Sequence, residues 1–572
     1  MEYDVAIIGG GPAGSTTGAM LMKYGPHLKV LILEREVFPR DHIGESLLPP
    51  LNLILDEMGV WEKVEAADFP IKIGATYRWG KHPELWDFSF ILAEEFRDEP
   101  RPAKFSGQRM STAFQVDRSI YDQILLDHAA EMGCEVRQNT KVARVHTDKR
   151  RVTGFELESG EVITARHYVD ASGNSGILRR AMGVQCDYPS TLRNIAIYDY
   201  WQNTGWAVKV GVGGTRIQVL SVGYGWLWFI PLGSTRTSIG LVIPVEYFKS
   251  SGRTPEELYK EAMQNEPIVA ALTKNAQSEG KLQTTRDWSF LADRQSGTNW
   301  FLVGECAGFA DPILSAGVLM AHTSARQLAF TILEIDRGEL DPNWLKQEFT
   351  HRQTQRIRTH IRFGDYWYTA NEQLKELKEF TQKLADDIGM EMTPEGAWDW
   401  IARGGFIDEE LTYGAGGFEL RAIQIMAGMM NGKEVVSHCA TNNVLKLKLD
   451  GAAVKDRAVY HEGRVMVSKC YVRAGKVLPM AGPFVPIVRF LEQSSDLFTV
   501  LQKLKAHVRE QTPDPGTQDR WFTVGLQILE ALVTDGWVAC SYDPAKPLID
   551  IDRRRRGVVW NTDMAEIAST AS

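Results

Sequence analysis

Hydrophobic and polar positions follow two different patterns along the first 360 residues. Residues 3–8 and 29–33 are short apolar stretches, typical of strands buried on both faces of a parallel sheet. Between residues 185 and 300 the pattern alternates with period two, for instance in 216–222 and 238–242. The order of these stretches predicts an α/β fold of the Rossmann type with an inserted antiparallel sheet.

Helical periodicity dominates the middle of the chain, and mixed patterns follow it. The predicted helices there are 319–339, 342–359 and 371–389. Beyond residue 430, strand-like stretches (435–437, 444–449, 464–472, 537–542) alternate with helical ones (497–510, 520–535). We therefore expect a core over residues 1–360 with its sheet inserted at about 185–300, a helical linker over 361–430, and a C-terminal α+β domain, winged-helix-like, over 431–572.

Composition narrows the class of protein. The chain has 64 basic and 73 acidic residues and a net charge of −9, which argues against nucleic-acid and anionic-membrane partners. A strand directly follows Met1 and no stretch of 18 apolar residues occurs, so we expect a cytoplasmic protein without signal peptide or spanning helix. Six scattered cysteines without a C-x-x-C pair predict neither a disulfide framework nor a metal site.

A glycine-rich segment follows the first predicted strand and opens a helix. Its residues, Gly9-Gly10-Gly11-Pro12-Ala13-Gly14, form the G-x-G-x-x-G pattern. Gly9 suits the tight turn, Gly11 lets the backbone approach a pyrophosphate, and Gly14 permits close helix packing. Glu34 follows the second strand, twenty residues after Gly14, where a carboxylate accepts hydrogen bonds from ribose hydroxyls. This spacing predicts a dinucleotide cofactor.

Further segments resemble those of the flavoprotein hydroxylases and halogenases, which implies that the cofactor is FAD. These segments are Pro39-Arg40 with Gly44-Glu45-Ser46, Val116-Asp117-Arg118, Val169-Asp170-Ala171-Ser172-Gly173 and the stretch from Val303 to Pro312. The resemblance implies that Glu305, an aspartate in most of the group, holds the ribityl chain. It also implies that the helix after Asp311-Pro312 directs its N-terminus, near Gly317 and Val318, at the flavin. The implied cofactor-binding residues are Gly9, Gly11, Pro12, Ala13, Gly14, Glu34, Arg40, Ser46, Arg118, Asp170, Glu305, Asp311, Gly317 and Val318.

A pair of tryptophans bears on whether the flavin serves hydroxylation or halogenation. Trp226-Leu227-Trp228-Phe229-Ile230-Pro231 resembles the W-x-W-x-I-P motif of flavin-dependent halogenases. Trp226 and Trp228 recur at period two and share one strand face, although core packing also produces such a pattern. In the family, the two indoles prevent a substrate from reaching the reactive edge of the flavin.

Lys72 lies in a strand-like stretch, 69–79, with Gly74 expected on the same face. Its position after the Gly-Glu-Ser segment matches the catalytic lysine of the halogenases; the alternative is a surface lysine on an edge strand. In the family, reduced flavin and oxygen give a hydroperoxide that oxidises chloride, and the hypochlorous acid travels to this lysine. The ammonium polarises the acid by hydrogen bonding, or the neutral amine carries chlorine as a chloramine.

The resemblance also implies a halide site of chloride or bromide on the stretch after Asp-Pro. Here that stretch is Ser315-Ala316-Gly317, which keeps the backbone donors but lacks the threonine hydroxyl of the family's Ser-Thr-Gly. Leu314 stands where the halogenases of free tryptophan have a glutamate. This departure favours the branch that acts on phenolic, tyrosine-like substrates, either free or tethered to a carrier protein, in natural-product biosynthesis.

The sequence therefore predicts a halogenase that receives reduced FAD from a separate flavin reductase, because no second dinucleotide motif is apparent. Gly211-Val212-Gly213-Gly214 lacks the third glycine, since Arg216 stands there, and predicts a sheet turn. Three alternatives stay open: an NAD(P)H-dependent aromatic hydroxylase, an isoprenoid-type ene-reductase and a non-catalytic flavin-binding assembly module.

Overall fold

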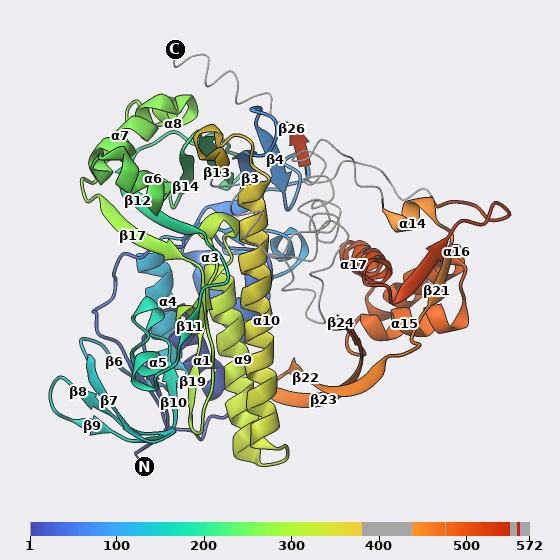
Figure 1. The fold of residues 1–572 in the computed structure, drawn as a ribbon, viewed down its shortest axis with the longest axis horizontal. Helices are drawn as coiled ribbons and strands as arrows, with labels where there is room; N and C mark the ends of the chain where they lie inside the picture. Colours follow the sequence, from blue (N-terminus) through green and yellow to red (C-terminus); the bar gives the residue numbers. More distant parts are fainter. Residues whose placement is uncertain (1, 380–436, 475, 550–557, 561–572) are drawn as a thin grey trace.

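The FAD-type half of the molecule is built on a parallel sheet. The computed structural model describes residues 2–379, 437–474, 476–549 and 558–560. The sheet has the strand order β19-β10-β1-β2-β6, with parallel pairing throughout. Its strands are β1 (Tyr3–Ile8), β2 (Val30–Leu33), β6 (Glu135–Arg137), β10 (Ala165–Asp170) and β19 (Trp300–Leu302). Helices α1 (Pro12–Tyr24), α4 (Arg118–Glu131) and α9 (Gly317–Arg337) lie beside it (Figure 1). The predicted α/β fold of the Rossmann type is confirmed.

A second, larger sheet lies next to this unit. Its path is β16-β12-β15-β14-β13-β3-β4-β26, with β17 on β12 and β5 on β3. The central strands are β12 (Arg193–Gln202), β13 (Gly214–Val222), β14 (Gly225–Pro231) and β15 (Arg236–Pro244). The other members are β3 (Ile71–Arg78), β4 (Trp86–Ser89), β5 (Ala113–Phe114), β16 (Gln277–Ser278), β17 (Gln283–Trp288) and β26 (Val558–Trp560).

This sheet differs from the predicted insert in two respects. It draws β3, β4 and β26 from outside residues 185–300, and β13 pairs with β3 in parallel while the other pairs are antiparallel. Alternation within one segment indicates a strand but says nothing about which distant strand pairs with it, so the pattern did not show these partners. The helices α6 (Val245–Ser251), α7 (Pro255–Asn265) and α8 (Pro267–Thr273) lie against the sheet, where Leu258 and Ile268 join its apolar core (Figure 1).

Two long helices follow the Asp311-Pro312 segment. Helix α9 agrees with the predicted 319–339 within two residues, but α10 (Pro342–Thr369) is ten residues longer than predicted. The extra turns contain Phe363, Gly364 and Trp367, which have weak helical propensity but are buried in this fold. Residues 371–377 form a turn and a 3-10 element, η5 (Lys375–Leu377), rather than the start of the predicted helix 371–389; residues 378 and 379 are helical, and 380–389 lie outside the described residues. Burial, not local propensity, decided the length of α10.

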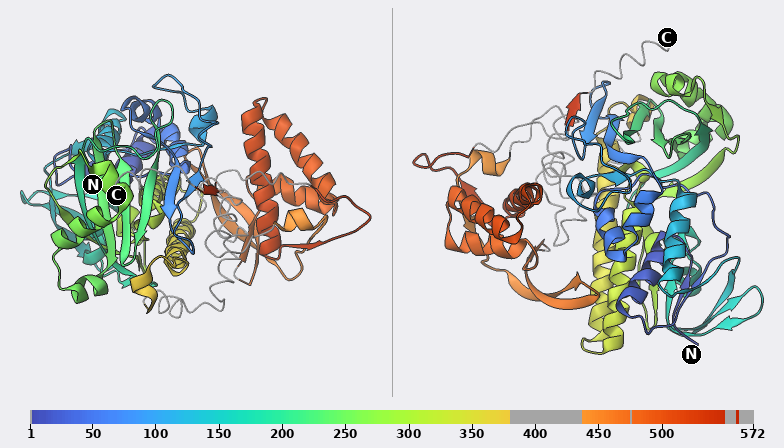
Figure 2. Two further views of the ribbon diagram at one scale, coloured as in Figure 1. Left: turned by 90° about the horizontal axis from the view of Figure 1, so that it is seen from above. Right: turned by 180° about the vertical axis from the view of Figure 1, so that it is seen from behind.

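The described C-terminal residues contain both strands and helices. A hairpin, β22 (Ala453–His461) and β23 (Arg464–Arg473), extends to α9 and α10, where Arg337 Nη1 donates to Gly463 O at 2.8 Å (Figures 1 and 2). Helices α15 (Phe484–Gln493), α16 (Leu497–Gln511) and α17 (Pro515–Thr534) pack with the pair β21 (Val444–Leu447) and β25 (Val538–Ser541) around a separate core. The remaining elements are the strand β24 (Lys476–Pro479) and the helix α14 (His438–Thr441). The winged-helix resemblance and the linker beyond residue 379 stay predictions.

The other described elements are short. They are helices α2 (Pro50–Met58), α3 (Trp61–Ala66) and α5 (Ile177–Ala181), the antiparallel group β7 (Val142–Asp148), β8 (Arg151–Leu157) and β9 (Val162–Ile163), and the group β11 (Cys186–Asp187), β18 (Phe290–Ala292) and β20 (Gly308–Phe309). Four 3-10 turns complete them: η1 (Gly107–Met110), η2 (Gly173–Ser175), η3 (Gly304–Cys306) and η4 (Pro312–Leu314). Among the described helices, none combines the length and the apolar character needed to cross a bilayer.

Candidate functional site

The predicted cofactor residues gather at one edge of the parallel sheet. The glycine segment follows β1, Glu34 follows β2, Asp170 ends β10, and Glu305 lies in η3 after β19. The carboxyl ends of parallel strands meet at the same edge, and nucleotide cofactors bind at that edge in open α/β sheets. The fold therefore brings together four segments that lie up to about three hundred positions apart in the chain.

The glycine segment has the geometry of a cradle that a side chain would fill. Gly9 adopts a φ of +102°, and a Cβ there would lie 2.4 Å from Ala171 O. A Cβ on Gly14 would lie 1.9 Å from Gly9 O, so helix α1 can start so close to the strand only with glycine there. Glu34 Oε2 accepts a hydrogen bond from Gly10 N at 2.7 Å. These constraints fit a pyrophosphate-binding turn followed by a ribose-binding carboxylate.

Two arginines extend this edge with positive charge. Arg118 forms a two-pronged ion pair with Asp122, Nε to Oδ1 at 2.6 Å and Nη2 to Oδ2 at 2.9 Å, and also donates to Ile43 O at 2.8 Å. Arg40 lies 3.3 Å from the same carboxylate and next to Gly11, whose added Cβ would lie 3.5 Å from Arg40 Nη2.

The Oγ of Ser46 is buried and has no hydrogen-bond partner within the described residues. Such an orphaned hydroxyl fits a cofactor contact.

The two predicted acids near β10 and β19 have different surroundings. Asp170 is fully buried and accepts hydrogen bonds from Ser172 N and Oγ, from Leu178 N and Arg179 N, and from Cys306 Sγ. The carboxylate oxygens of Asp170 are therefore already hydrogen-bonded within the protein. Any part of Asp170 in cofactor binding would be to fix the loop that follows β10. Glu305 accepts no hydrogen bond within the described residues, and burial raises the pKa of its carboxyl while Arg118 opposes this shift. Glu305 is the acid that is available to a ligand.

Lys72 lies in β3 and is buried, with 2% of its surface exposed. Its Nζ donates to Leu47 O at 3.0 Å, one residue past Ser46, and lies 5.4 Å from the centre of the Phe90 ring. No carboxylate within the described residues forms an ion pair with it. Burial without a counter-charge lowers the pKa of Lys72 from 10.5 to about 7. The lysine therefore faces the cofactor segment and exchanges its proton near neutral pH, unlike a surface lysine.

A bulge interrupts the strand at this lysine. Lys72 pairs with Thr215 and Gly74 with Arg216, so Ile73 has no partner on β13. The pairing with β13 is therefore irregular between Lys72 and Gly74, which the sequence pattern did not show, while Ile71 and Ile73 still pack in one apolar cluster. Bulges re-aim side chains and are enriched next to active sites.

Trp226 and Trp228 both lie in β14 with their rings on the same side, in the large core that also contains the FAD-type unit. Their ring centres are 6.1 Å apart. Trp228 Nε1 donates to Ser238 Oγ at 3.0 Å, and the indole covers Gly240, where a Cβ would lie 2.2 Å from the ring. The predicted shared face is confirmed. Both indoles belong to the core that also contains the parallel sheet, whereas the intervening Leu227 and the following Phe229 belong to the core under α7 and α8.

The predicted halide stretch leads into helix α9. Ser315 adopts a left-handed φ of +54°, and Ala316 is the residue before the first turn. Within the described residues, no side chain caps this helix start, so the amides near Gly317 and Val318 are available to an anion or to a flavin. The geometry fits both roles that the resemblance implied for this stretch.

Asp311, in the same motif, contacts residues that the sequence analysis did not single out. Its Oδ1 accepts from Ile313 N at 2.8 Å and from the Tyr368 hydroxyl at 3.3 Å, and its Oδ2 accepts from Asn194 Nδ2 at 3.2 Å. Burial raises the pKa of Asp311 to about 7. Tyr368 lies on the part of α10 beyond the predicted helix. No local pattern could have identified the contacts with Tyr368 and Asn194, because these partners lie 57 and 117 positions away.

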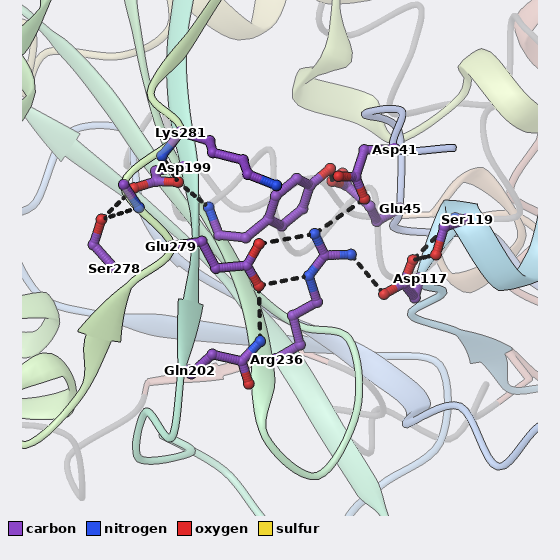
Figure 3. A network of polar contacts seen from close by, with 12 residues as sticks. Asp41, Glu45, Asp117, Ser119, Asp199, Gln202, Arg236, Ser278, Glu279 and Lys281 are labelled. Atoms are coloured by element: carbon purple, nitrogen blue, oxygen red, sulfur yellow. Dashed lines mark hydrogen bonds and ion pairs between the residues drawn. The ribbon is translucent and has the colours of Figure 1, made fainter. Parts of the chain in front are cut away.

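A cluster around Arg236 connects the cofactor segment to the large sheet (Figure 3). Arg236 Nη1 donates to Asp117 Oδ2 at 2.8 Å, Nη2 to Asp41 Oδ1 at 3.0 Å and Nε to Glu279 Oε1 at 3.0 Å. Its guanidinium lies 3.9 Å from the centre of the Tyr200 ring. Burial lowers the pKa of Arg236, but the hydrogen bonds to Asp117 and Glu279 outweigh this effect and the net pKa is raised.

Comparisons with known proteins identify the family. The tryptophan halogenase family model matches residues 4–98 and 91–377. A tryptophan 2-halogenase from Chondromyces crocatus is 34% identical over 346 residues, 59% of this chain and 62% of that enzyme. A 1H-pyrrole-2-carbonyl-(peptidyl-carrier protein) chlorinase from Pseudomonas fluorescens is 33% identical over 364 residues, 61% of this chain and 79% of that enzyme. The chain thus spans less than two thirds of the length of the Chondromyces enzyme.

Solved structures extend the likeness into the C-terminal part. The flavin-dependent halogenase CmlS has a TM-score of 0.71 at 26% identity and covers 96% of this chain and 98% of its own. The myxobacterial chondrochloren halogenase CndH has a TM-score of 0.58 at 27% identity, over 75% of this chain and 97% of its own. Because the family model matches more than half of the chain and the structural neighbours carry the same fold, this protein belongs to the tryptophan halogenase family of flavin-dependent halogenases.

Proposed function

We propose that this halogenase uses O2 and reduced FAD to oxidise chloride or bromide and transfers the halogen through Lys72 to an electron-rich, phenolic ring. The observation that carries the proposal is the state of Lys72: buried, without a carboxylate partner within the described residues, and hydrogen-bonded to the residue after Ser46. A lysine with a purely structural role is rarely buried without a counter-charge, because burying an uncompensated charge lowers the free energy of unfolding.

The cofactor would be held by the cradle of Gly9, Gly11 and Gly14, by Glu34 and by the free carboxylate of Glu305. Reduced flavin, when bound, supplies the activated oxygen that converts halide into hypohalous acid. The amides near Gly317 would bind the halide. We further propose that a separate flavin reductase delivers the reduced cofactor.

Lys72 would act on the hypohalous acid as a neutral amine. Its nitrogen lone pair attacks the chlorine, hydroxide leaves and takes the amine proton as water, and an N–Cl bond remains. The aromatic ring then attacks this chlorine, the nitrogen keeps the electron pair of the N–Cl bond and takes up a proton from solvent, and the ring loses its proton to solvent, which regenerates the amine. The pKa of about 7 places enough neutral amine at physiological pH for this route.

Two observations bear on the substrate class. Leu314, rather than an acid, precedes the halide stretch, and it is buried against the core. Without a carboxylate there, the ring must be activated by its own substituents, as a phenol is. The similarity to a chlorinase of a carrier-bound pyrrole supports a carrier-tethered substrate as well as a free one.

The test uses the purified full chain with FAD, a flavin reductase, NADH, chloride or bromide, and a panel of phenols and pyrroles. We expect products with the isotope pattern of chlorine or bromine, and little NADH oxidation when the reductase is omitted. Hydroxylated products without halogen, formed by this protein and NADPH alone, would instead identify an aromatic hydroxylase.

A further inference from the structure

The hydroxyl of Tyr368 lies where the tryptophan pair meets the segment that leads to the halide stretch. Trp226 Nε1 lies 2.7 Å from this hydroxyl, Asn194 Nδ2 lies 3.2 Å from it, and Asp311 Oδ1 lies 3.3 Å from it. The four residues are buried, and they come from β14, β12, the Asp-Pro segment and α10. One oxygen atom therefore joins four separate parts of the chain.

The directions of these hydrogen bonds follow from the groups. An indole N–H and an amide NH₂ can only donate, so the Tyr368 oxygen accepts from Trp226 and from Asn194. The single hydroxyl proton is then directed to Asp311, whose carboxylate also accepts from Ile313 N at 2.8 Å and so starts the turn before Ser315. All hydrogen-bonding positions of the hydroxyl are used, which selects one orientation of the phenol and one of the indole.

We propose that Tyr368 is a positioning residue for halogenation. Its hydroxyl holds the indole plane of Trp226 and the turn before the halide stretch in one mutual geometry. This inference rests on the proposed function, because the orientation of Trp226 matters only if the oxidised halogen must travel past it. Without the hydroxyl, the Trp226 N–H is a buried donor that has lost its acceptor. We expect the indole to change its orientation so that the N–H reaches another acceptor.

Packing alone does not require this hydroxyl. The ring of Tyr368 contacts Trp79 at 5.6 Å between ring centres, and Trp79 also contacts Trp226 at 6.3 Å. A phenylalanine at position 368 would keep the first contact. Tyr77, in the same aromatic cluster, stacks on Trp86 at 4.7 Å, and its hydroxyl makes no hydrogen bond within the described residues. The cluster thus offers a matched phenol that performs only packing.

The experiment compares Tyr368→Phe with the control Tyr77→Phe in the full-length protein with FAD and reductase. The readout is halogenated product per reduced flavin oxidised, with hydrogen peroxide as the competing product. We expect Tyr368→Phe to bind FAD as the wild type does and to lower this ratio about tenfold, the effect of one buried hydrogen bond. Tyr77→Phe should leave the ratio unchanged. Equal ratios in wild type and Tyr368→Phe would overturn the proposal.

A double-mutant cycle tests the route through the indole. Trp226→Phe removes the donor, so Tyr368→Phe should cause a smaller loss in that background than in the wild type; strictly additive losses would overturn the proposal. A crystal structure of Tyr368→Phe gives a readout that does not depend on halogenation. An unchanged Trp226 orientation there would refute the positioning role, whereas absence of product from the wild type would refute the proposed function instead.

Discussion

Lys72 and Arg236 are two cations on the same ten-stranded sheet, and their surroundings are opposite. Arg236 donates to three carboxylates, from Asp41, Asp117 and Glu279, and stacks on Tyr200. Lys72 donates to a single backbone carbonyl and faces Phe90. The pKa of Arg236 is consequently raised, whereas burial lowers the pKa of Lys72 to about 7.

This difference is what we expect between a cation that stabilises the fold and the amine that we propose takes part in halogenation. Arg236 keeps its charge at every accessible pH and ties the cofactor segment at Asp41 to the cap of α4 at Asp117 and to the sheet. Lys72 sits where its charged form is poorly compensated, which destabilises the fold but makes the amine reactive. The sheet therefore carries one cation held by three carboxylates, Arg236, and one buried amine without a counter-charge, Lys72.

The largest expected effect follows from removing the amine. Lys72→Ala should lower product formation by roughly a thousandfold or more, because the amine that we propose carries the halogen is removed, while FAD stays bound. The measurement is product by mass spectrometry together with FAD absorbance of the purified variant. The exposed Lys29→Ala serves as the control. Near-normal yields from Lys72→Ala would remove this residue from the mechanism.

The second effect concerns stability. Arg236→Ala leaves three carboxylates around an empty position, so the free energy of unfolding should fall by about 3 kcal/mol. Thermal unfolding of the FAD-bound protein should show a lower Tm, and the loss should shrink in high salt because screening weakens repulsion between the carboxylates. Arg144→Ala, an exposed arginine 4.0 Å from Glu156, should change the Tm little. A Tm unchanged by Arg236→Ala would show that the tether is not structural.

The smallest effect is a gain in stability at low pH. Between pH 7 and 10.5 the unfolded chain binds a proton at Lys72 that the folded chain does not, so the stability of the wild type rises with pH across this window. Lys72→Met removes this dependence. The variant should be more stable than the wild type at pH 6, and this advantage should shrink as the pH rises toward 10. Urea unfolding at both pH values measures this, and a pH-independent difference would contradict the lowered pKa.

Local sequence motifs were enough to predict the glycine turn and the acidic residue after β2. The spacing of Gly9, Gly11 and Gly14 with Glu34 encodes a turn whose steric demands are satisfied within one βαβ unit, so the sequence pattern was sufficient. The prediction that Trp226 and Trp228 share a face succeeded for the same reason, because the period of a strand is local. The length of α10 was wrong by ten residues, since buried aromatic packing overrode weak propensity at Phe363 and Trp367.

The sequence by itself determined the cofactor motif, the fold class, the tryptophan pair and the position of the candidate lysine. Only the tertiary structure decided that Lys72 is buried without a counter-charge, that Ile73 forms a bulge beside it, and that Arg236 and Tyr368 join distant segments. The physical reason is the range of the interactions. Turn sterics and strand period act over a few residues, whereas desolvation and hydrogen bonds depend on partners that folding brings together from more than a hundred positions away.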